Sequence, residues 1–390
     1  MSWPLVKLGD LFKVTSGGTP SRKKSEYYDG GDIHWVKTGD LHNKYVRSAS
    51  EFITQEGLDG SSARLYPKGT VLVAMYGATI GACSILDIKA ATNQACAAFT
   101  PTEKVDPVFL YYLLKHSKPA FVKAGSGGAQ PNISATFLKN FEIPLPPLEE
   151  QKRIAAILDK ADAIRQKRKQ AIDLADEFLR SVFLDMFGDP VTNPKGWEVG
   201  TIRDIVSTVN YGTSGKASET DGEFPILRMG NITYKGGWDF SDLKYIDLDD
   251  KDQGKYLARK NDLLFNRTNS KELVGKTAVF NESRPMAIAG YLIRVRTNEL
   301  GNPWYISGYL NSSHGKQTLL NMCKSIVGMA NINAQELQDI NILLPPVELQ
   351  NKYESIVKEV NERVSRHHES VKELQVLFNA LSQKAFSGQL

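Results

Sequence analysis

The sequence predicts a mixed α/β protein made of two copies of one unit, each a globular domain followed by a long helix. The stretch "ISATFLKNFEIPLPPLEEQ" at 133–151 recurs as "INAQELQDINILLPPVELQ" at 332–350, 199 positions later and in one ungapped register. Residues 148–187 and 347–386 contain neither Gly nor Pro and are rich in good helix formers. An internal repeat of this kind decides the architecture.

The repeat sets the expected boundaries. It extends upstream more weakly, since "GDIHWVKTGDL" at 31–41 aligns with "GEFPILRMGNI" at 222–232, and "DPVFLYYLL" at 106–114 aligns with "NPWYISGYL" at 302–310. The globular parts show short β-rich runs separated by Gly- and Asn-rich turns, with a few helices. We therefore expect a domain at 1–146, a helix at 147–188, a second domain at 189–346 and a final helix at 347–390.

Both long helices carry a heptad pattern, with seam positions spaced alternately three and four residues apart. Sustained over about four heptads, this spacing predicts that the helices pair as an antiparallel coiled coil with pseudo-twofold symmetry. Two amphipathic helices lying on separate domains are the alternative. A polar layer of Arg168, Arg363, His367 and Ser370 would fix the register. The predicted seam consists of Ile154, Ile157, Ala161, Ile164, Ala171, Ala175, Phe178 and Val182 in the first helix, and Tyr353, Ile356, Val360, Leu374, Leu377 and Leu381 in the second.

The composition limits the class of protein. With 390 residues, 41% hydrophobic and 24% charged, a packed globular chain is expected. No run of about 18 apolar residues predicts a membrane span, and the first residues lack a secretory signal. The odd number of cysteines, without metal-ligand spacing, indicates reduced thiols in a cytoplasmic protein, and no metal site is predicted. The net charge of +4 resides in residues 1–146, which permits nucleic-acid binding without requiring it.

The predicted shape suggests a ruler. A helix of about 36 residues is roughly 54 Å long at about 1.5 Å per residue. One turn of B-DNA is roughly 34 Å. Two similar but divergent domains on such helices could recognise separate half-sites on one face of a duplex.

The whole chain resembles the DNA-specificity subunit of type I restriction–modification systems. The resemblance is carried by "WPLVKLGDLFKVTSGGTPS", "VLVAMYGATIG", "TNQACAAF", "IPLPPLEEQKRIAAILDKAD" and the terminal "AFSGQL". It implies binding of a bipartite double-stranded DNA target, one half per domain. It also implies assembly with two modification subunits, which are S-adenosylmethionine-dependent adenine methyltransferases, and with a restriction subunit that uses ATP and Mg²⁺ for translocation and cleavage.

The resemblance implies no catalysis by this chain and no cofactor of its own, and the sequence agrees. The Pro-Pro pairs are preceded by Leu145 and Leu344, whereas an amino-methyltransferase needs Asn or Asp there. No phosphate-binding loop of the G-x-x-x-x-G-K-[ST] type is present. "GSGGAQ" at 125–130 is more typical of a flexible loop than of a cofactor site. A stand-alone methyltransferase or nuclease, a structural adaptor, and the specificity subunit of a related multi-subunit restriction system remain alternatives.

DNA contacts require cations, hydroxyls and amides on loops near strand ends. Ordinary surface polarity is the competing interpretation of every such residue. In the first domain the candidates are Thr19, Ser21, Arg22, Lys23, Lys24, Lys37, Thr38, His42, Asn43, Lys44, Tyr76, Thr79 and Gln130, with Asn93, Gln94 and Asn132 as weaker ones. In the second domain they are Tyr211, Thr213, Ser214, Lys216, Arg228, Asn231, Tyr234, Lys235, Asn266, Arg267, Asn269, Ser270 and Lys271, of which Arg267, Asn269 and Arg228 are the strongest.

Overall fold

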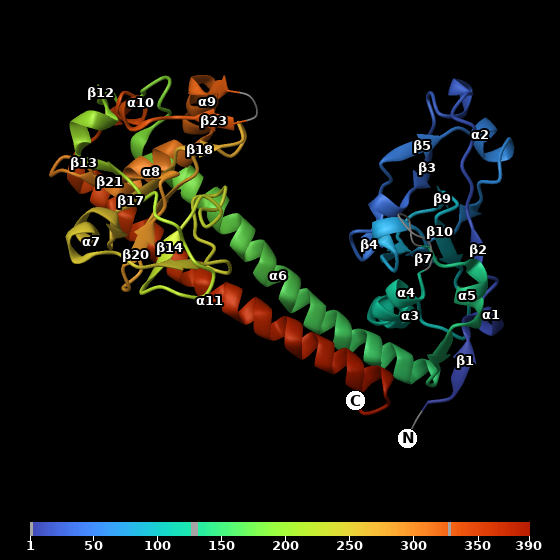
Figure 1. Ribbon diagram of the computed structural model, residues 1–390. Coiled ribbons are helices and arrows are strands. Elements are labelled where there is room, and N and C mark those ends of the chain that lie inside the picture. Colours follow the sequence, from blue (N-terminus) through green and yellow to red (C-terminus); the bar gives the residue numbers. More distant parts are fainter. Residues whose placement is uncertain (1–2, 126–131, 327–328) are drawn as a thin grey trace. The chain divides into compact units, whose positions relative to one another are not determined.

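The computed structural model describes residues 3–125, 132–326 and 329–390 (Figure 1). The chain forms two compact units: unit 1 comprises Met1–Arg168 and Glu369–Leu390, and unit 2 comprises Lys169–His368. Each unit contains a globular domain and half of each long helix, α6 (Leu148–Phe187) and α11 (Val347–Phe386). The predicted mixed fold with two long helices is confirmed.

Three sheets form the globular part of unit 1. A pair joins β1 to β11, a five-stranded sheet has the order β2-β10-β7-β8-β4, and a four-stranded sheet has the order β5-β3-β9-β6. The strands are β1 (Leu5–Lys7), β2 (Thr15–Ser16), β3 (Ile33–Val36), β4 (Tyr45–Val46), β5 (Glu51–Ile53), β6 (Leu65–Tyr66), β7 (Val71–Ala74), β8 (Cys83–Leu86), β9 (Ala90–Thr92), β10 (Cys96–Phe99) and β11 (Glu142–Pro144). The helices are α1 (Leu8–Leu11), α2 (Gln55–Asp59), α3 (Pro107–His116), α4 (Lys118–Ala124) and α5 (Ala135–Asn140), with 3₁₀ turns η1 (Ser25–Tyr27), η2 (Thr38–Asp40) and η3 (Gly77–Thr79).

Unit 2 repeats this plan. Its sheets have the orders β12-β24, β13-β21-β17-β19 and β15-β14-β20-β16, with an additional sheet β18-β23-β22. The strands are β12 (Glu198–Thr201), β13 (Val206–Tyr211), β14 (Phe224–Leu227), β15 (Lys244–Ile246), β16 (Leu257–Ala258), β17 (Leu263–Asn266), β18 (Thr268–Asn269), β19 (Thr277–Val279), β20 (Met286–Ile288), β21 (Leu292–Thr297), β22 (Lys324–Ile326), β23 (Met329–Asn331) and β24 (Asn341–Leu344). The helices are α7 (Asp250–Tyr256), α8 (Pro303–Asn311), α9 (Ser313–Met322) and α10 (Ala334–Gln338), with the 3₁₀ turn η4 (Ile202–Ile205).

The two units therefore share one topology. The order β2-β10-β7-β8 matches β13-β21-β17-β19, and the order β5-β3-β9-β6 matches β15-β14-β20-β16. In each unit the two central strands of the second of these sheets run parallel, β3 with β9 and β14 with β20. The weak upstream similarity in sequence thus reflects a true structural repeat.

Each domain is joined to the long helices by its core. In unit 1, Phe109 of α3 packs edge-to-face against Phe386 of α11, with ring centroids 5.7 Å apart. In unit 2, the ring centroids of Tyr305 in α8 and Phe187 in α6 lie 4.6 Å apart. Phe386 follows Phe187 by 199 positions, so both units use equivalent helix positions to hold equivalent aromatic rings. The helix ends are part of the domain cores.

The repeated proline motif ends in a buried glutamine that fastens the domain to its helix. Gln151 accepts a hydrogen bond from Asp106 N (2.9 Å) and donates to Lys104 O (3.0 Å) and Pro146 O (2.9 Å). In unit 2, Gln350 makes the same three bonds, to Asn302 N, Leu300 O and Pro345 O. We call these bonds of Gln151 and Gln350 the glutamine latch. Every partner is a main-chain atom, so the latch does not depend on which side chains the domain carries.

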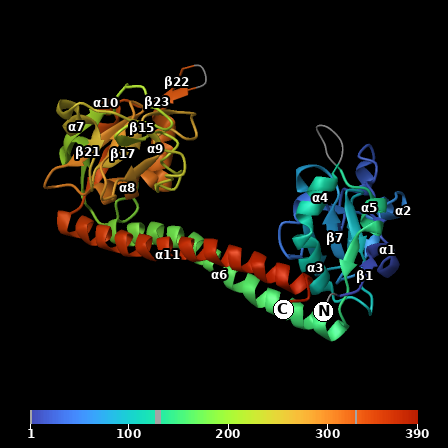
Figure 2. The same ribbon diagram turned by 60° about the horizontal axis from the view of Figure 1, so that its bottom comes forward.

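The long helices pair antiparallel within each unit, and the two views agree on their lying side by side (Figures 1 and 2). In unit 1, Arg165 bonds to Gln375 and Arg168 to Ser370, so rising numbers in α6 meet falling numbers in α11. In unit 2, the rings of Phe183 and Tyr353 lie 5.5 Å apart.

The predicted seam residues at every seventh position are buried or partly buried, whereas three of the predicted residues between them are exposed. Ile154, Ala161, Ala175, Val182, Tyr353, Val360, Leu374 and Leu381 are wholly or partly buried, as is Ala171. Three intervening positions of the prediction are exposed: Ile164 (43%), Phe178 (52%) and Leu377 (62%). Their neighbours Arg165, Leu179 and Phe378 are buried or partly buried instead, and the fully buried Leu158 takes the place predicted for the partly buried Ile157.

The same one-residue displacement occurs in both helices. In α11 Val357 is buried beside the partly exposed Ile356, and Val364 takes the place predicted for the exposed Arg363. The order of the three- and four-residue steps is therefore four then three, the reverse of the predicted one. His367 is partly buried, and the described residues contain no group of three or more potential metal-ligating side chains. Within the described ranges, every helix is too short or too polar to cross a bilayer.

Candidate nucleic-acid interface

In unit 1, main-chain hydrogen bonds bring together the segments that follow β2, β3, β7 and β9. Together with the segment before α5 that contains Ile133, these segments come from five separate parts of the sequence, and they carry many of the polar residues expected to contact DNA. We call this set of bonds the strand-end frame. It consists of Gly18 N to Thr92 O (2.9 Å), Asn93 N to Val36 O (3.0 Å), Met75 N to Ala95 O (2.8 Å) and Ile133 N to Met75 O (3.0 Å).

Side chains of the predicted set meet on this frame. Thr19 Oγ1 donates to Gln94 Oε1, which joins the loop after β2 to the segment after β9. Arg22 and Lys37 both form ion pairs with Glu51 of β5. The bond from Lys37, and then that from Arg22, holds the pKa of the Glu51 carboxyl below its usual range. Glu51 thus orders two cations that are distant in sequence.

Arg22 also stacks on aromatic rings. Its guanidinium carbon lies 4.3 Å from the centroid of Tyr28 and 5.3 Å from that of Trp35. Burial raises the pKa of Tyr28, and the nearby Arg22 opposes this shift. A stacked guanidinium on a partly exposed loop keeps donor groups oriented, which suits contact with an acceptor such as a phosphate or a base edge.

Other predicted residues of unit 1 differ in their availability. Lys44 is mostly covered and forms an ion pair with Asp159 of α6, which also accepts a bond from Tyr112 Oη at 2.6 Å, so this lysine fastens the domain to the helix. Lys24 donates to Tyr27 Oη at 2.9 Å, and this bond raises the pKa of Lys24. Gln130 lies outside the described residues. Exposed or partly exposed are Ser21, Lys23, Thr38, His42, Asn43, Tyr76 and Thr79.

Tyr76 lies beside the frame. It directly follows the frame residue Met75 and pairs as an isolated bridge with the exposed Asn132. Thr79 Oγ1 donates to Tyr76 O at 2.9 Å. The tyrosine ring, the Asn132 amide and Gln94 are therefore presented by neighbouring backbone segments, although they are far apart in the sequence.

Unit 2 contains the same frame. Each of its four bonds has a counterpart in unit 1, between equivalent strand ends. They run from Thr213 N to Ile288 O (2.8 Å), from Ala289 N to Leu227 O (2.9 Å), from Arg267 N to Tyr291 O (3.0 Å) and from Ile332 N to Arg267 O (2.9 Å). The backbone geometry is repeated, whereas the side chains it presents are not: Arg267 occupies the place of Met75.

Arg267 is the central polar residue of this second frame. Its guanidinium carbon lies 4.6 Å from the ring centroid of Tyr211, and its Nη2 is 3.4 Å from Asn331 Oδ1. The Tyr211 hydroxyl accepts a bond from Ala334 N at 3.0 Å, which holds the ring in place. The buried Arg267 Nε has no hydrogen-bond partner among the described residues. Arg267 thus retains donor capacity beside an oriented aromatic ring.

Two predicted contacts in unit 2 are wrong because their side chains are buried. Asn231 is 3% exposed; its Oδ1 accepts from Arg228 N (2.8 Å) and its Nδ2 donates to Asp239 O (2.9 Å) and Asp242 O (3.1 Å). Asn266 is fully buried at the end of β17. Both amides shape the backbone of the domain, so neither is free to contact a base.

The remaining candidates of unit 2 are at least partly exposed. Arg228 donates to the main-chain and side-chain oxygens of Asp242 at 2.9 and 2.8 Å, and Lys235 pairs with Asp176 of α6. Asn269 Oδ1 accepts from Ser270 N at 2.9 Å. Thr213 lies in the frame itself. Lys216, Ser214, Tyr234 and Lys271 are exposed.

The sequence did not indicate three residues of these sites. Glu51 and Tyr28 organise Arg22, and the exposed Tyr291 follows β20 next to Arg267 in the frame. Glu51 is brought to Lys37 only by the register of β5 on β3, where Glu51 lies opposite Trp35. Neither an acidic residue nor a tyrosine before a strand carries a local signal for such a role.

The comparisons with known proteins agree with this repeated arrangement. A family model described as the type I restriction modification DNA specificity domain matches residues 2–174 and again residues 194–375. The chain belongs to the type I restriction–modification DNA specificity family. The two matches divide between the two copies of the structural repeat.

Members of the specificity family are similar over the full length. The type I restriction enzyme MjaIX specificity subunit of Methanocaldococcus jannaschii is 26% identical over 411 aligned positions, covering 100% of this chain and 93% of that protein. The S subunit of a type I restriction–modification system from M. genitalium has a TM-score of 0.59 at 16% identity, covering 98% of this chain and 96% of that one. A chain from a structure concerning complex assembly and conformational transition of the type I R-M system has a TM-score of 0.59 at 19% identity, covering 100% and 98%. At these identities the two structures establish the fold.

Proposed function

We propose that this chain supplies the DNA sequence specificity of a type I restriction–modification complex and that each unit reads one half of a bipartite double-stranded target. The observation that carries the proposal is the strand-end frame. The same four main-chain bonds occur in both units, yet the side chains presented differ, with Arg267 in place of Met75. A shared backbone scaffold that presents different polar side chains is suited to two units that each recognise a different half-site.

The long helices are the proposed docking surface for two modification subunits. Each carries large apolar side chains that the antiparallel pairing leaves exposed: Ile164, Val376 and Leu377 in unit 1, and Leu174 and Phe178 in unit 2. Exposed apolar residues clustered on a helix surface are typical of protein–protein contact. Docked modification subunits would also supply positive surface that residues 189–346, with 18 basic and 18 acidic residues, lack.

Catalysis is assigned to the partners. In this proposal the modification subunits bind S-adenosylmethionine and methylate adenine, and a restriction subunit uses ATP and Mg²⁺. This chain contributes recognition and assembly in the cytoplasm.

The proposal is tested by mapping methylated adenines across the genome of cells that express the modification subunit with and without this chain. We expect a split sequence motif to be methylated only when the chain is present. Methylation by the purified chain alone, or a motif that persists without the chain, would contradict the proposal. An assembled complex with no sequence preference would indicate a structural adaptor instead.

A further inference from the structure

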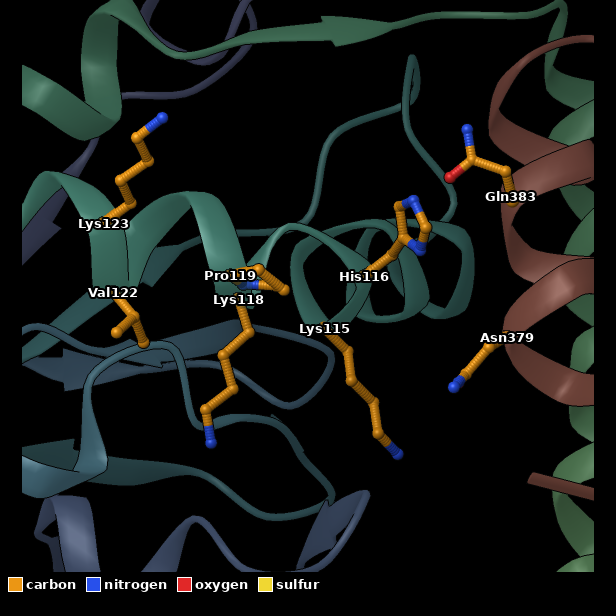
Figure 3. Close-up of a pocket in the computed structure, with 8 residues that line it drawn as sticks. All are labelled: Lys115, His116, Lys118, Pro119, Val122, Lys123, Asn379 and Gln383. Carbon is orange, nitrogen blue, oxygen red and sulfur yellow. The ribbon is translucent and has the colours of Figure 1, made fainter. Parts of the chain in front are cut away.

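Unit 1 contains a pocket of about 750 Å³ where α3 and α4 face the last turns of α11 (Figure 3). None of its lining residues belongs to the strand-end frame. None of its lining residues is acidic and four are basic side chains. The lining consists of Lys115, His116, Lys118, Pro119, Val122, Lys123, Asn379 and Gln383.

Three hydrogen-bond donors face the same side of this pocket. Figure 3 shows the side chains of Lys115 and Lys118 extending in one direction, and the side chain of Asn379 extending from α11 on the side of Lys115. Asn379 Oδ1 accepts a bond from Gln375 Nε2 at 2.9 Å, which leaves its Nδ2 to face the pocket. In the same view Lys123 extends the opposite way. The donors therefore suit a ligand that only accepts hydrogen bonds.

The two lysines at this site are not neutralised by the protein. Lys115 donates to Tyr111 Oη at 3.0 Å and lies 5.1 Å from the centroid of the Tyr111 ring. Burial lowers its pKa, opposed by the more distant Asp162. Within the described ranges, neither Lys115 nor Lys118 forms an ion pair. A partly buried ammonium without a carboxylate partner is a favourable place for an external anion.

Unit 2 has a group of cations of its own, one of them on the long helix α6. Arg180 precedes Asn379 by 199 positions on the other long helix, and its charge, like that of Lys276, acts on Lys316. Lys276 Nζ donates to Met229 O at 2.7 Å and Lys316 Nζ to Tyr234 O at 3.3 Å. Burial, together with repulsion from Lys276 and Arg180, lowers the pKa of Lys316 to about 8.

The location of the second cluster indicates which anion it would meet. Met229 and Tyr234 belong to the loop that follows β14, which begins with Arg228 beside the frame. The loop that begins beside the frame therefore carries the two carbonyl groups to which Lys276 and Lys316 donate. Ammonium and guanidinium groups hold phosphate diesters without reading sequence.

We propose that the pocket formed by Lys115, Lys118 and Asn379 in unit 1, and the cluster of Arg180, Lys276 and Lys316 in unit 2, each hold a backbone phosphate of the bound DNA. The proposal rests on the proposed function. It adds two sequence-independent contacts, placed at the junction of each domain with a long helix. These contacts would fix the position of the duplex on each unit while the frame reads bases.

The test uses the complex assembled with its modification subunits and measures the dissociation constant on target and non-target duplexes over a range of salt concentrations. Lys118→Gln and Arg180→Gln remove exposed cations of the two sites. Each should weaken binding to both duplexes by a similar factor and reduce the slope of log K against log salt by about 0.9, the contribution of one phosphate. The double variant should lose about twice as much. Lys123→Gln, on the same helix as Lys118, is the matched control and should leave the slope unchanged.

The outcomes separate this proposal from the proposed function. An unchanged slope in Lys118→Gln and Arg180→Gln, or an equal loss in Lys123→Gln, overturns the phosphate sites while leaving sequence recognition intact. If the variants impair assembly with the modification subunits and leave the salt slope unaltered, the pocket receives an acidic protein segment and the proposal is also wrong. Failure of the wild-type complex to prefer any sequence would instead reject the proposed function.

Discussion

At the residue scale, the repeated motif is explained by a single buried side chain. Gln151 is 1% exposed and satisfies three main-chain groups, two of them at the entry to α3. The recurrence of glutamine after Pro-Pro could be predicted from the sequence, because the two copies align without a gap. Its role could not, since the partners at 104 and 106 lie about 45 residues earlier and become neighbours only in the folded domain.

Replacing this glutamine should destabilise unit 1. Gln151→Ala leaves Asp106 N and two carbonyl groups without partners in a buried site, which we expect to cost about 3 kcal/mol. Gln170→Ala, at an exposed position of the same helix, is the control and should change stability little. Urea denaturation of the purified chain measures both, and equal midpoints for the two variants would contradict the latch.

Arg267 is the residue on which recognition by unit 2 is expected to depend most. Arg267→Ala removes a stacked guanidinium that retains donor capacity, and we expect it to weaken binding of the assembled complex to the target by about 1–3 kcal/mol. Binding to non-target DNA should change little. The exposed Arg284, which donates to Glu223 O at 3.2 Å, provides the control variant Arg284→Ala. A uniform loss on both duplexes would show that Arg267 contacts phosphate and not a base.

The type of a polar residue alone does not distinguish a side chain that can contact DNA from one that stabilises the domain. Arg228, Asn231 and Asn266 are all candidates by sequence, yet both asparagines are buried and Arg228 forms an ion pair with Asp242. The difference arises from turn geometry and strand register, which place one amide inward and its neighbour outward. Such differences are set by contacts distant in sequence.

At the element scale, the long helices show how far a heptad pattern can be interpreted. Residues such as Ile154 and Ala161, seven apart, belong to the seam under either order of steps. Ile164 and Arg165, or Phe178 and Leu179, are adjacent, and apolar residues are found in both sets. The structure selects Arg165 because it bonds to Asp162 and Gln375 within unit 1. Ile164, Phe178 and Leu377 of the other set are left on the surface, whereas Ile157 and Ile356 are partly buried.

The corrected seam makes a direct prediction for two positions of α6. Leu158 is fully buried, so Leu158→Ala should lower the free energy of unfolding by about 2–5 kcal/mol. Ile164→Ala, at an exposed position, should change it by less than about 1 kcal/mol and should instead weaken assembly with the modification subunit. Denaturant unfolding and co-purification measure the two effects. If Ile164→Ala lowered the free energy of unfolding more than Leu158→Ala does, the heptad order predicted from the sequence would be favoured over the corrected one.

The loop after β14 is held by Lys276 and Lys316, and this contact gives unit 2 a pH dependence. Because the pKa of Lys316 falls from 10.5 to about 8 on folding, the unfolded chain binds more protons between these values. Stability should therefore rise as pH increases from about 8 to 10.5, by up to about 1.4 kcal/mol per unit from this group. The penalty of burying the charge is fully present below pH 8.

Thermal unfolding of wild type and Lys316→Met across pH 7–10 measures this contribution. Other titrating groups affect both proteins and cancel in the difference. The variant should gain stability relative to wild type at pH 7 and lose that advantage by pH 10. A difference that stays constant with pH would contradict the assignment.

At the scale of the whole molecule, the repeat links recognition to assembly. The two copies share strand order, the strand-end frame and the glutamine latch, and the family model matches both. The fold class, the repeat and the long helices could be predicted because they depend on local composition and on a 199-residue period. The frame could not, since it joins strand ends that only the tertiary fold brings together.

The latch predicts that one pair of helices can hold domains of different sequence. Gln151 and Gln350 contact only main-chain atoms of the domains, so a domain of different sequence can satisfy the same three bonds. Exchange of residues 1–146 should therefore preserve folding and assembly, although the Phe109–Phe386 contact would need an apolar residue in the new domain.

The most direct test of the account is the methylation motif of a chain whose residues 1–146 are replaced by the corresponding segment of a family member with a different target. Genome-wide mapping of methylated adenines should show that one half of the split motif changes to that of the donor while the other half is retained. If both halves change, or if neither does, the assignment of one half-site to each unit is wrong.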